Sequence, residues 1–269
     1  MAYDDLLDLA VEVAVEAAEL VRVRRREGVE VAATKSSPVD VVTEVDRASE
    51  RLIYERLMTA RPDDGFLGEE GGSAESASGV VWVVDPIDGT VNFLYGIPHY
   101  AVSIAASVDG EPVAGVVLNV VSGETFTATR GGGAFRDGVP LRIGSDGAPP
   151  PLAQRLVGTG FNYVADVKLK QTVAVSALLR EVRDVRRMGS AALDLCSVAA
   201  GRVDAYVEEG LNPWDMAAGG LVATEAGARL ETHPGAGGGG CVVCAPADAF
   251  ETFLDLVSRA GFLAAKSLS

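Results

Sequence analysis

An apolar run that ends abruptly at two aspartates is the feature of this sequence that most restricts how the chain can fold. Residues 80–84, Val-Val-Trp-Val-Val, are typical of a buried strand. Pro86 lacks the backbone N–H that a strand ladder needs, so the strand should end at Asp85. Asp85 and Asp88 are therefore expected on a turn at the end of a buried strand.

The residues of this turn have the chemistry of a site that binds a cation and an anion together. Asp85 and Asp88 are three residues apart, and their like charges repel unless a cation lies between them. Hard carboxylate oxygens favour magnesium or calcium. Gly89 lets another group approach the backbone, Thr90 adds a hydroxyl, and both N–H groups can meet an anion. We expect metal, anion and hydroxyl to converge here.

Composition excludes several classes of protein. With 23 basic and 38 acidic residues, the net charge of −15 argues against a surface that binds nucleic acid or anionic membranes. No apolar run is long enough for a transmembrane helix, and the hydrophobic fraction of 48% is that of a globular protein. The first residues are acidic and lead into an amphipathic pattern instead of a signal peptide. We expect a soluble, cytoplasmic protein with no nucleic-acid or membrane partner.

Cysteine and histidine carry little functional signal. Three cysteines are too few for a disulfide framework in 269 residues, which favours a reducing compartment. Cys241 and Cys244 form a C-x-x-C, but the apolar residues around them predict a short buried strand, so core packing is favoured over redox or zinc chemistry. His99 and His233 fit no metal or triad spacing, and a surface or core role is favoured for both.

Periodicity predicts helices in the first part of the chain and a linker near its middle. Apolar residues recur at helical spacing over residues 3–27, and a second helix is expected over residues 43–60. The segment 144–151, rich in glycine and proline, is the expected linker. It would divide a single catalytic domain into a metal-binding α+β subdomain, residues 1–143, and an α/β subdomain, residues 152–269.

Strands and helices are also expected on both sides of this linker. Alternation between glycine turns predicts an antiparallel meander before it, at 102–108, 113–119 and 124–129. After it, strands at 156–160 and 203–207 should alternate with helices at 168–181, 190–200 and 216–226. The glycine-rich loop 234–240 is interpreted as a flexible turn with nothing to cradle a phosphate.

Two further acidic residues lie at the edges of expected elements. Glu69 is in a glycine-bounded loop between a helix and a strand, and Asp215 would lie at the N-terminal end of a helix. Taken singly, Glu69 suits a solvated loop charge and Asp215 a helix N-cap. Together with the aspartates of the turn they indicate a site for two magnesium ions, which need several carboxylates and at least one bridging ligand.

Three motifs occur in an order and spacing that match a known family. They are G-E-E at 68–70, W-x-x-D-P-x-D-G-T-x-N-F at 82–93 and W-D-x-A-A-G at 214–219, supported by segments 40–46 and 189–194. With these motifs the chain resembles the inositol monophosphatase family over nearly its whole length. The resemblance implies an α+β fold, the layered αβαβα sandwich of inositol monophosphatases and fructose-1,6-bisphosphatases. It also implies a homodimer and a magnesium-dependent, lithium-sensitive phosphatase that acts on a small phosphomonoester.

The resemblance assigns metal ligands to positions of this chain. Glu69, Asp85 and the carbonyl of Ile87 would hold one magnesium ion, and Asp85, Asp88 and Asp215 a second. A third, weaker ion would use Glu69 and water. Manganese would substitute for magnesium, and lithium and calcium would inhibit.

The resemblance also assigns catalytic roles. Thr90 would position the attacking water, Asp46 would accept its proton through the threonine hydroxyl, and Glu69 would take part through its metal. Backbone N–H groups of Gly89 and Thr90 would bind the phosphate oxygens. No phosphoenzyme is needed, because water attacks phosphorus in line with the leaving oxygen.

Substrate contacts are assigned by resemblance as well. Glu208 and the backbone of Ala191 would contact the inositol hydroxyls, and Asp88 would be shared between metal and sugar. Glu209 directly follows Glu208, so the match is open by one residue, and a solvated-edge role suits either glutamate equally well.

The favoured function is hydrolysis of inositol-1-phosphate to inositol and phosphate. Related families with the same metal core act on histidinol phosphate, fructose 1,6-bisphosphate or adenosine 3′,5′-bisphosphate, and these substrates stay open. The alternative of another class is a metal-binding scaffold for a protein partner. The intact set of matched residues disfavours that alternative.

Overall fold

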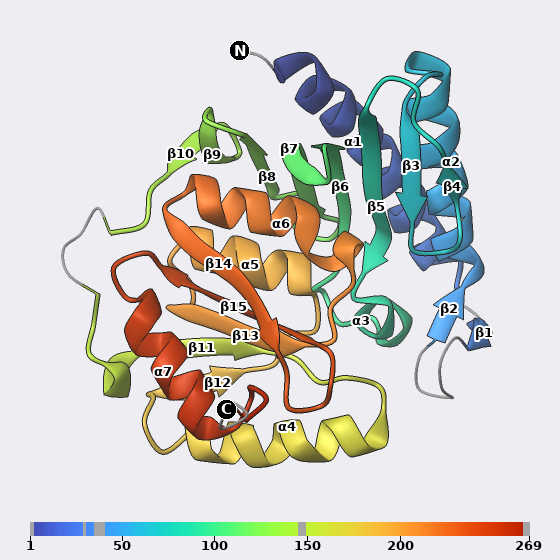
Figure 1. The fold of residues 1–269 in the computed structure, drawn as a ribbon. Coiled ribbons are helices and arrows are strands. Elements are labelled where there is room, and N and C mark those ends of the chain that lie inside the picture. Colours follow the sequence, from blue (N-terminus) through green and yellow to red (C-terminus); the bar gives the residue numbers. More distant parts are fainter. Residues whose placement is uncertain (1–2, 29–30, 35–40, 145–148, 266–269) are drawn as a thin grey trace.

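The chain folds into alternating layers of helices and β-sheets in the computed structural model (Figure 1), which describes residues 3–28, 31–34, 41–144 and 149–265. The helices are α1 (Asp4–Glu27), α2 (Glu44–Ala60), α3 (Thr90–Tyr95), α4 (Ala165–Leu178), α5 (Ala191–Ala199), α6 (Pro213–Glu225) and α7 (Phe250–Ala260). A short pair, β1 (Val31–Thr34) and β2 (Val41–Thr43), lies before α2.

The larger sheet has eight strands in the order β10-β9-β8-β7-β6-β5-β3-β4. Only the β3–β5 pair in this sheet is parallel. Its strands are β3 (Gly65–Gly68), β4 (Ser73–Ala74), β5 (Val80–Asp88), β6 (Ala101–Val108), β7 (Glu111–Asn119), β8 (Thr125–Thr129), β9 (Gly133–Arg136) and β10 (Val139–Leu141). The run from β6 to β8 is the predicted meander.

The smaller sheet has five strands in the order β12-β11-β13-β15-β14. Its central strand β13 pairs in parallel with β11 and antiparallel with β15. The strands are β11 (Leu156–Thr159), β12 (Asp184–Arg186), β13 (Ala205–Glu209), β14 (Ala228–Pro234) and β15 (Gly240–Pro246), preceded by a 3-10 turn at Leu152–Gln154.

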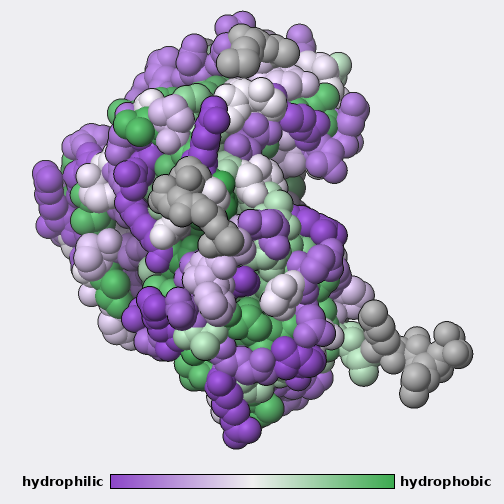
Figure 2. All heavy atoms as spheres, turned by 90° about the vertical axis from the view of Figure 1, so that its left-hand side faces the viewer, coloured by the Kyte–Doolittle hydropathy of each residue, from purple (hydrophilic) through white to green (hydrophobic). Residues whose placement is uncertain are grey.

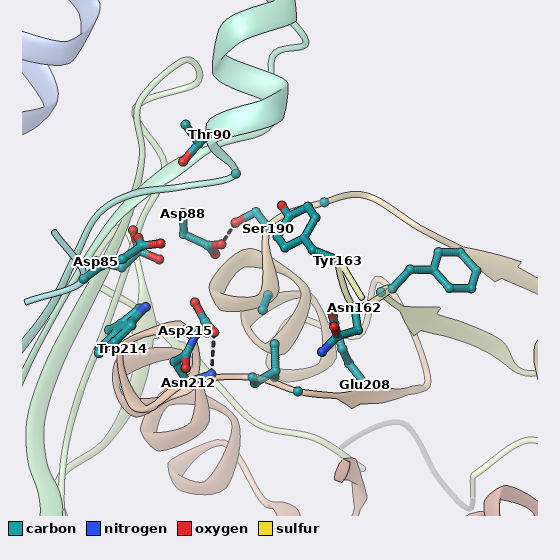
Figure 3. A pocket seen from close by; sticks show the side chains of 18 of the residues that line it. Asp85, Asp88, Thr90, Asn162, Tyr163, Ser190, Glu208, Asn212, Trp214 and Asp215 are labelled. Carbon is teal, nitrogen blue, oxygen red and sulfur yellow. Dashed lines mark hydrogen bonds between the residues drawn. The ribbon is translucent and has the colours of Figure 1, made fainter. Parts of the chain in front are cut away.

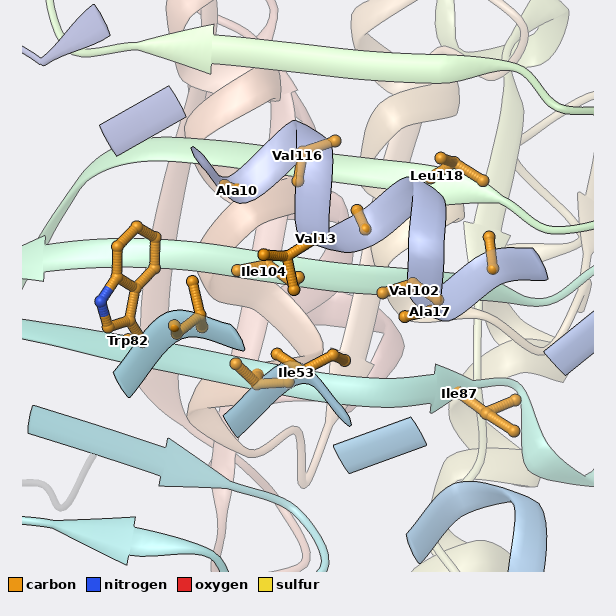
Figure 4. Packing of buried hydrophobic residues seen from close by; sticks show 14 of the residues in the cluster. Ala10, Val13, Ala17, Ile53, Trp82, Ile87, Val102, Ile104, Val116 and Leu118 are labelled. Atoms are coloured by element: carbon orange, nitrogen blue, oxygen red, sulfur yellow. The ribbon is translucent and has the colours of Figure 1, made fainter. Parts of the chain in front are cut away.

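Helices α1 and α2 cover one face of the larger sheet. The stripe on α1 that faces the sheet contains Ala10, Val13 and Ala17, and their small side chains let the helix lie close to strands β6 and β7 (Figure 4). Trp82 of β5 is fully buried in this cluster, and its indole N–H donates to the carboxylate of Asp64 at 3.0 Å. The sequence thus predicted both helices and, through its apolar periodicity, the buried stripe of α1.

Helices α5 and α6 form the middle layer between the two sheets. Leu193 of α5 and Leu221 of α6 pack in one cluster with Val83 and Ala105 of the larger sheet. Leu195 of α5 lies in a second cluster with residues of the smaller sheet. Because these helices bury residues against both sheets, their sequences are apolar nearly all round.

Helices α4 and α7 cover the outer face of the smaller sheet, where Leu178, Phe250 and Phe253 pack with strand residues. The order helix, sheet, helix, sheet, helix confirms the predicted α+β sandwich of the αβαβα type. Cys241 belongs to this outer cluster and Cys244 to the inner one, and both are free thiols. The two cysteines face opposite sides of β15 and act in core packing, as predicted.

Most predicted elements are present with shifts of a few residues. One prediction is wrong: strand β5 does not end at Asp85 but continues to Asp88. The predicted linker lies partly outside the described residues, and the division into subdomains stays a prediction. Within the described ranges, the helices are too short or too polar to cross a membrane. Figure 2 shows hydrophilic residues over much of one face, with smaller apolar patches between them.

Candidate active site

The two aspartates at the end of β5 lie at a bulge. Asp85 pairs with Ser103 of β6 and Asp88 with Ala101, so three steps along β5 match two along its partner. Pro86 lies in this interruption, where its missing N–H costs no ladder bond. The bulge is the reason that the strand continues past the proline. It also turns both carboxylates, which are buried, toward the same pocket (Figure 3).

Gly89 ends the bulge and begins α3. Its φ of +98° is in the left-handed region, which favours glycine. A Cβ at this position would lie 3.1 Å from the carbonyl oxygens of both Gly189 and His99. Glycine is therefore required both by the backbone angle and by the closeness of other segments to the backbone.

Asp215 reaches this turn from the middle layer. It is the third residue of α6, and one carboxylate oxygen accepts the N–H of Asn212 at 2.6 Å. Asp85, Asp88 and Asp215 each offer an oxygen, and these oxygens all lie within 4.8 Å of one another. The sequence predicted that Asp215 is either an N-cap or a metal ligand. In the structure its carboxylate caps α6 and also belongs to the acidic cluster.

Burial and mutual repulsion disfavour ionisation of these carboxyl groups. Burial raises the pKa of Asp85 well above its usual range, and the charges of Glu69, Asp88 and Asp215 raise it further. Burial likewise raises the pKa of Asp88 to about 7, although hydrogen bonds from Ser190 and Ala192 lower it. The pKa of Asp215 is also raised by burial and by Asp88.

The donor set fits a divalent cation. Several carboxylates that repel one another in a buried pocket can all be ionised when a cation lies between them, and oxygen-only ligands are those of magnesium and calcium. The acidic cluster of Asp85, Asp88 and Asp215 is therefore able to bind a metal ion.

Glu69 lies in the loop after β3 and lines the same pocket. Its N–H donates to the carbonyl of Val84 at 3.2 Å, which holds the loop beside β5. Glu50 of α2 holds the rest of this loop, because its buried carboxylate accepts the N–H groups of Glu70 at 2.7 Å and Gly72 at 2.9 Å. Glu50 was not singled out from the sequence, where it reads as an ordinary charge on a helix.

Thr90 and Asp46 form a hydrogen-bonded pair beside the cluster. The Thr90 hydroxyl lies 3.0 Å from a carboxylate oxygen of Asp46 and 3.1 Å from the carbonyl of Ile87. Asp46 is fully buried in the first turn of α2, and its second oxygen accepts the N–H of Thr43 at 2.9 Å. Burial raises the pKa of Asp46, partly offset by the bonds from Thr43 and Thr90. Asp46 and Thr90, which are 44 residues apart in the sequence and were paired by the family resemblance, are thus in contact.

The start of α5 forms the other support of the turn. The hydroxyl of Ser190 donates to Asp88 at 2.6 Å, and the N–H of Ala192 donates to the same oxygen at 2.7 Å. Ser190 is also the N-cap of α5. Ala191 lines the pocket between these two residues. Ser190 lies in the family segment 189–194, but no role was predicted for the serine.

Glu208 and Glu209 face opposite sides of β13. The hydroxyl of Tyr206 hydrogen-bonds the carboxylate of Glu208, and both glutamates are among the residues that line the pocket of the acidic cluster. The carboxylate of Glu209 instead accepts N–H groups from Gly237 and Gly239, both at 3.0 Å. Loop 234–240 is therefore held by an internal carboxylate and is not the free turn that was predicted.

The pocket between these elements also contains residues to which the sequence assigned no role. Asn162 and Tyr163 follow β11 and lie across the pocket from the aspartates, and Trp214 lies next to Asp215 (Figure 3). Arg187 lines the pocket as well; burial raises the pKa of Glu208, and the hydrogen bond from Tyr206 and the charge of Arg187 partly offset this rise. Asn162, Tyr163 and Arg187 were not predicted, because they lie outside the family motifs, whereas Trp214 is the first residue of the motif at 214–219.

The sequence of this chain matches a known protein family. The sequence profile described as the inositol monophosphatase family matches residues 2–260. This chain belongs to the inositol monophosphatase family. It is accordingly a phosphatase.

Named relatives agree with the family assignment. The inositol-1-monophosphatase SuhB of Mycobacterium tuberculosis H37Rv is 48% identical over 258 residues, which are 90% of this chain and 89% of the relative. The Nus factor SuhB of Pasteurella multocida is 41% identical over 224 residues, 82% of this chain and 83% of that protein. The relatives therefore carry two kinds of name.

Solved structures agree with the observed layers. SuhB of Bartonella henselae has a TM-score of 0.85 at 33% identity and covers 95% of this chain and 99% of its own. SaIMPase-II with inositol monophosphate bound has a TM-score of 0.72 at 25% identity and covers 95% of this chain and 98% of its own.

Proposed function

We propose that this protein hydrolyses inositol-1-phosphate to inositol and phosphate in a magnesium-dependent reaction. The observation that carries the proposal is the cluster of Asp85, Asp88 and Asp215, with oxygens within 4.8 Å of one another, beside the hydrogen bond from Thr90 to Asp46. The family supports the reaction class. The names of the mycobacterial relative and of the inositol-phosphate complex of SaIMPase-II support the substrate.

Magnesium is the proposed metal, with two to three ions at full occupancy. Glu69, Asp85 and the carbonyl of Ile87 would hold one ion, Asp85, Asp88 and Asp215 another, and Glu69 with water a third. When bound, magnesium supplies positive charge that makes water more acidic and stabilises negative charge on the phosphate and the leaving oxygen. Manganese would replace it, and lithium and calcium would inhibit.

The residues of the chain have distinct roles in the proposed reaction. The Thr90 hydroxyl positions the attacking water and gives its own proton to Asp46 as it takes one from that water. The water oxygen forms the new bond to phosphorus, the ester P–O bond breaks, and the inositol oxygen gains a proton from solvent. The N–H groups of Gly89 and Thr90 stabilise the phosphate oxygens, as the positive end of α3 favours.

Substrate selection is assigned to the side of the pocket away from Thr90. Glu208 would accept hydrogen bonds from inositol hydroxyls, because it is half-buried, lines the pocket and keeps acceptor capacity beside the bond from Tyr206. The backbone of Ala191 and the carboxylate of Asp88 would contribute further contacts. The support is the opposite orientation of Glu209, whose carboxylate is occupied by the glycine loop.

A substrate panel tests the proposal. Phosphate release is measured with and without magnesium from inositol-1-phosphate, histidinol phosphate, fructose 1,6-bisphosphate and adenosine 3′,5′-bisphosphate. We expect the highest kcat/KM for inositol-1-phosphate, and inhibition by lithium. A higher kcat/KM for any of the other three would replace the proposed substrate.

An Asp88→Asn variant tests the metal-dependent mechanism. Loss of one charge from the cluster should lower kcat/KM by on the order of 10²-fold or more, because charge stabilisation at the phosphate depends on it. Asp63→Asn, at an exposed aspartate, is the matched control and should behave like the wild type. Wild-type turnover by Asp88→Asn would refute the mechanism.

The second candidate function is a scaffold for a protein partner, which the relative named Nus factor SuhB favours. Complementation of a deletion strain separates the two functions. Rescue by Asp88→Asn at wild-type abundance would assign the phenotype to a partner role, whereas failure to rescue would assign it to hydrolysis.

The proposed quaternary state is a homodimer, and the proposed location is the cytoplasm. Light scattering of the purified protein tests the first, with a mass near twice 27.8 kDa as the expected result. Fractionation of cells tests the second.

A further inference from the structure

Buried polar residues behind the substrate side of the pocket connect it to the glycine loop. Gln171 of α4 is only 3% exposed, and its amide group makes two hydrogen bonds to different segments. Its oxygen accepts the N–H of Asn162 at 2.8 Å, and its nitrogen donates to the carbonyl of Glu209 at 3.2 Å. Gln171 thus ties the segment after β11 to the end of β13.

Glu209 extends this connection to the glycine loop. Its carboxylate, on a residue that is 2% exposed, accepts the N–H groups of Gly237 and Gly239. A Cβ at Gly235 would lie 2.3 Å from the carboxyl carbon of Glu209, so the loop encloses the carboxylate closely. The loop is further tied to α4, because Lys170 donates to the carbonyl of Ala236 at 3.0 Å.

Two side chains of the pocket wall lie very close to the backbone of the opposite segment. The side-chain nitrogen of Asn162 lies 2.1 Å from where a Cβ of Gly210 would be, and the carboxylate of Glu208 lies 2.0 Å from the corresponding point at Gly160. The four residues in these contacts all line the pocket. A shift of the segment after β11 relative to the end of β13 would therefore change the space available beside Glu208.

We propose that Gln171 and Glu209 are positioning residues for substrate specificity, which fix the pocket wall of Asn162, Tyr163 and Glu208 opposite the acidic cluster. The proposal rests on the proposed function, since it concerns the wall that would meet the leaving group of the ester. Both residues would act through this wall, and Glu209 is itself among the residues that line the pocket. Their side chains make the hydrogen bonds that hold the wall, and other segments of the chain hold the pair of Thr90 and Asp46.

The test separates binding of the leaving group from the chemical step. Gln171→Met keeps the shape of the side chain and removes both hydrogen bonds, and Glu209→Gln places a donor against one of the two glycine N–H groups. For each variant we expect KM for inositol-1-phosphate to rise five- to tenfold with kcat within about twofold of the wild type. KM for p-nitrophenyl phosphate, whose leaving group has no hydroxyls, should change less than twofold.

Thr172→Val is the matched control, because Thr172 is an exposed neighbour of Gln171 on α4 whose hydroxyl donates to the carbonyl of Lys168 within the same helix. This variant should leave KM and kcat unchanged for both inositol-1-phosphate and p-nitrophenyl phosphate. Equal losses for both ester types in the Gln171 and Glu209 variants, or a fall in kcat with KM unchanged, would overturn the proposal in favour of a merely structural role.

Amide hydrogen exchange provides a readout that does not depend on turnover. Glu209→Gln should accelerate exchange at Gly237 and Gly239 and also at Asn162, whose N–H bonds to Gln171 and not to Glu209. Faster exchange confined to the glycine loop would overturn the coupling. If the substrate panel favours another ester, the proposed function fails, and the same comparison is made with that ester against p-nitrophenyl phosphate.

Discussion

The hydroxyl of Thr90 lies within hydrogen-bond distance of two acceptors, the carboxylate of Asp46 and the carbonyl of Ile87. A hydroxyl with one proton donates to one of them at a time and keeps lone pairs for a water. We expect Thr90→Val, which keeps the shape and removes the hydroxyl, to lower kcat by about 10²- to 10⁴-fold, because positioned proton transfer contributes that much.

Steady-state kinetics with saturating magnesium measure this effect, and Thr172→Val serves as its control. Because the phosphate would still meet the N–H of residue 90, KM should change little. A kcat within threefold of the wild type would show that the threonine hydroxyl takes no part in the rate-limiting step.

Asp194 of α5 makes stability depend on pH. It is 1% exposed, and one of its oxygens has no hydrogen-bond partner among the residues that the structure describes. Burial raises its pKa well above the usual range, with added repulsion from Glu208 and Asp88. The folded state therefore holds a proton that the unfolded state releases above about pH 4. Stability contributed by this group falls as pH rises from about 4 toward the raised pKa.

Asp194→Asn removes this penalty, because the amide stays neutral. We expect the variant to have the higher Tm at pH 8, by about 2 °C or more, and no advantage at pH 4. Asp63→Asn, at an exposed position, should show no such dependence. An Asp194→Asn Tm below that of the wild type at pH 8 would mean that the carboxylate is stabilised by an interaction that the amide cannot replace.

At the scale of elements, the contact between α5 and α6 depends on a glycine. A Cβ at Gly219 of α6 would lie 2.8 Å from the carbonyl oxygen of Ala192 on α5, a backbone atom that cannot move without the helix. At the next residue, Gly220, the nearest atom is the end of the Leu230 side chain at 3.2 Å. Gly219 and Gly220 are thus neighbours in one helix, but only a side chain at position 219 would meet the backbone of another helix.

We expect Gly219→Ala to lower the free energy of unfolding by about 1–3 kcal/mol through overpacking. Gly220→Ala should be neutral or gain up to about 1 kcal/mol from helix propensity. Urea unfolding of both variants measures the difference. Equal stabilities would show that α5 moves aside without cost.

The elements could be predicted from the sequence where local pattern decides, as in the apolar stripe of α1 and the alternation of β6 to β8. The end of β5 could not, because a bulge against β6 depends on a partner that periodicity does not see. The residues of the acidic cluster could be predicted because they lie in the family motifs. The roles of Glu50, Gln171 and Glu209 could not be predicted, since each bonds to loop N–H or carbonyl groups that are distant in sequence.

At the scale of the whole molecule, the acidic cluster joins two layers. Asp85 and Asp88 belong to the larger sheet and Asp215 to the middle helices, so a metal bound between them links these layers. Magnesium at about 100 times its Kd should stabilise the fold by about 2.7 kcal/mol and raise Tm by about 5 °C.

Thermal unfolding with magnesium and with chelator measures this shift at constant ionic strength. Asp215→Asn should lose most of it, whereas Asp63→Asn should keep it. An equal shift in both variants would assign the effect to general screening of the net charge of −15.

The separation of the ligands along the chain has a consequence during synthesis. Asp85 and Asp88 leave the ribosome about 130 residues before Asp215, and their turn is also held by Ser190 and Ala192. A nascent or truncated chain that stops before α5 has both aspartates but neither the donors from Ser190 and Ala192 to Asp88 nor the third carboxylate. The cluster can therefore bind a metal only after α6 has been synthesised, and we expect incomplete products of translation to be unable to act on phosphate esters.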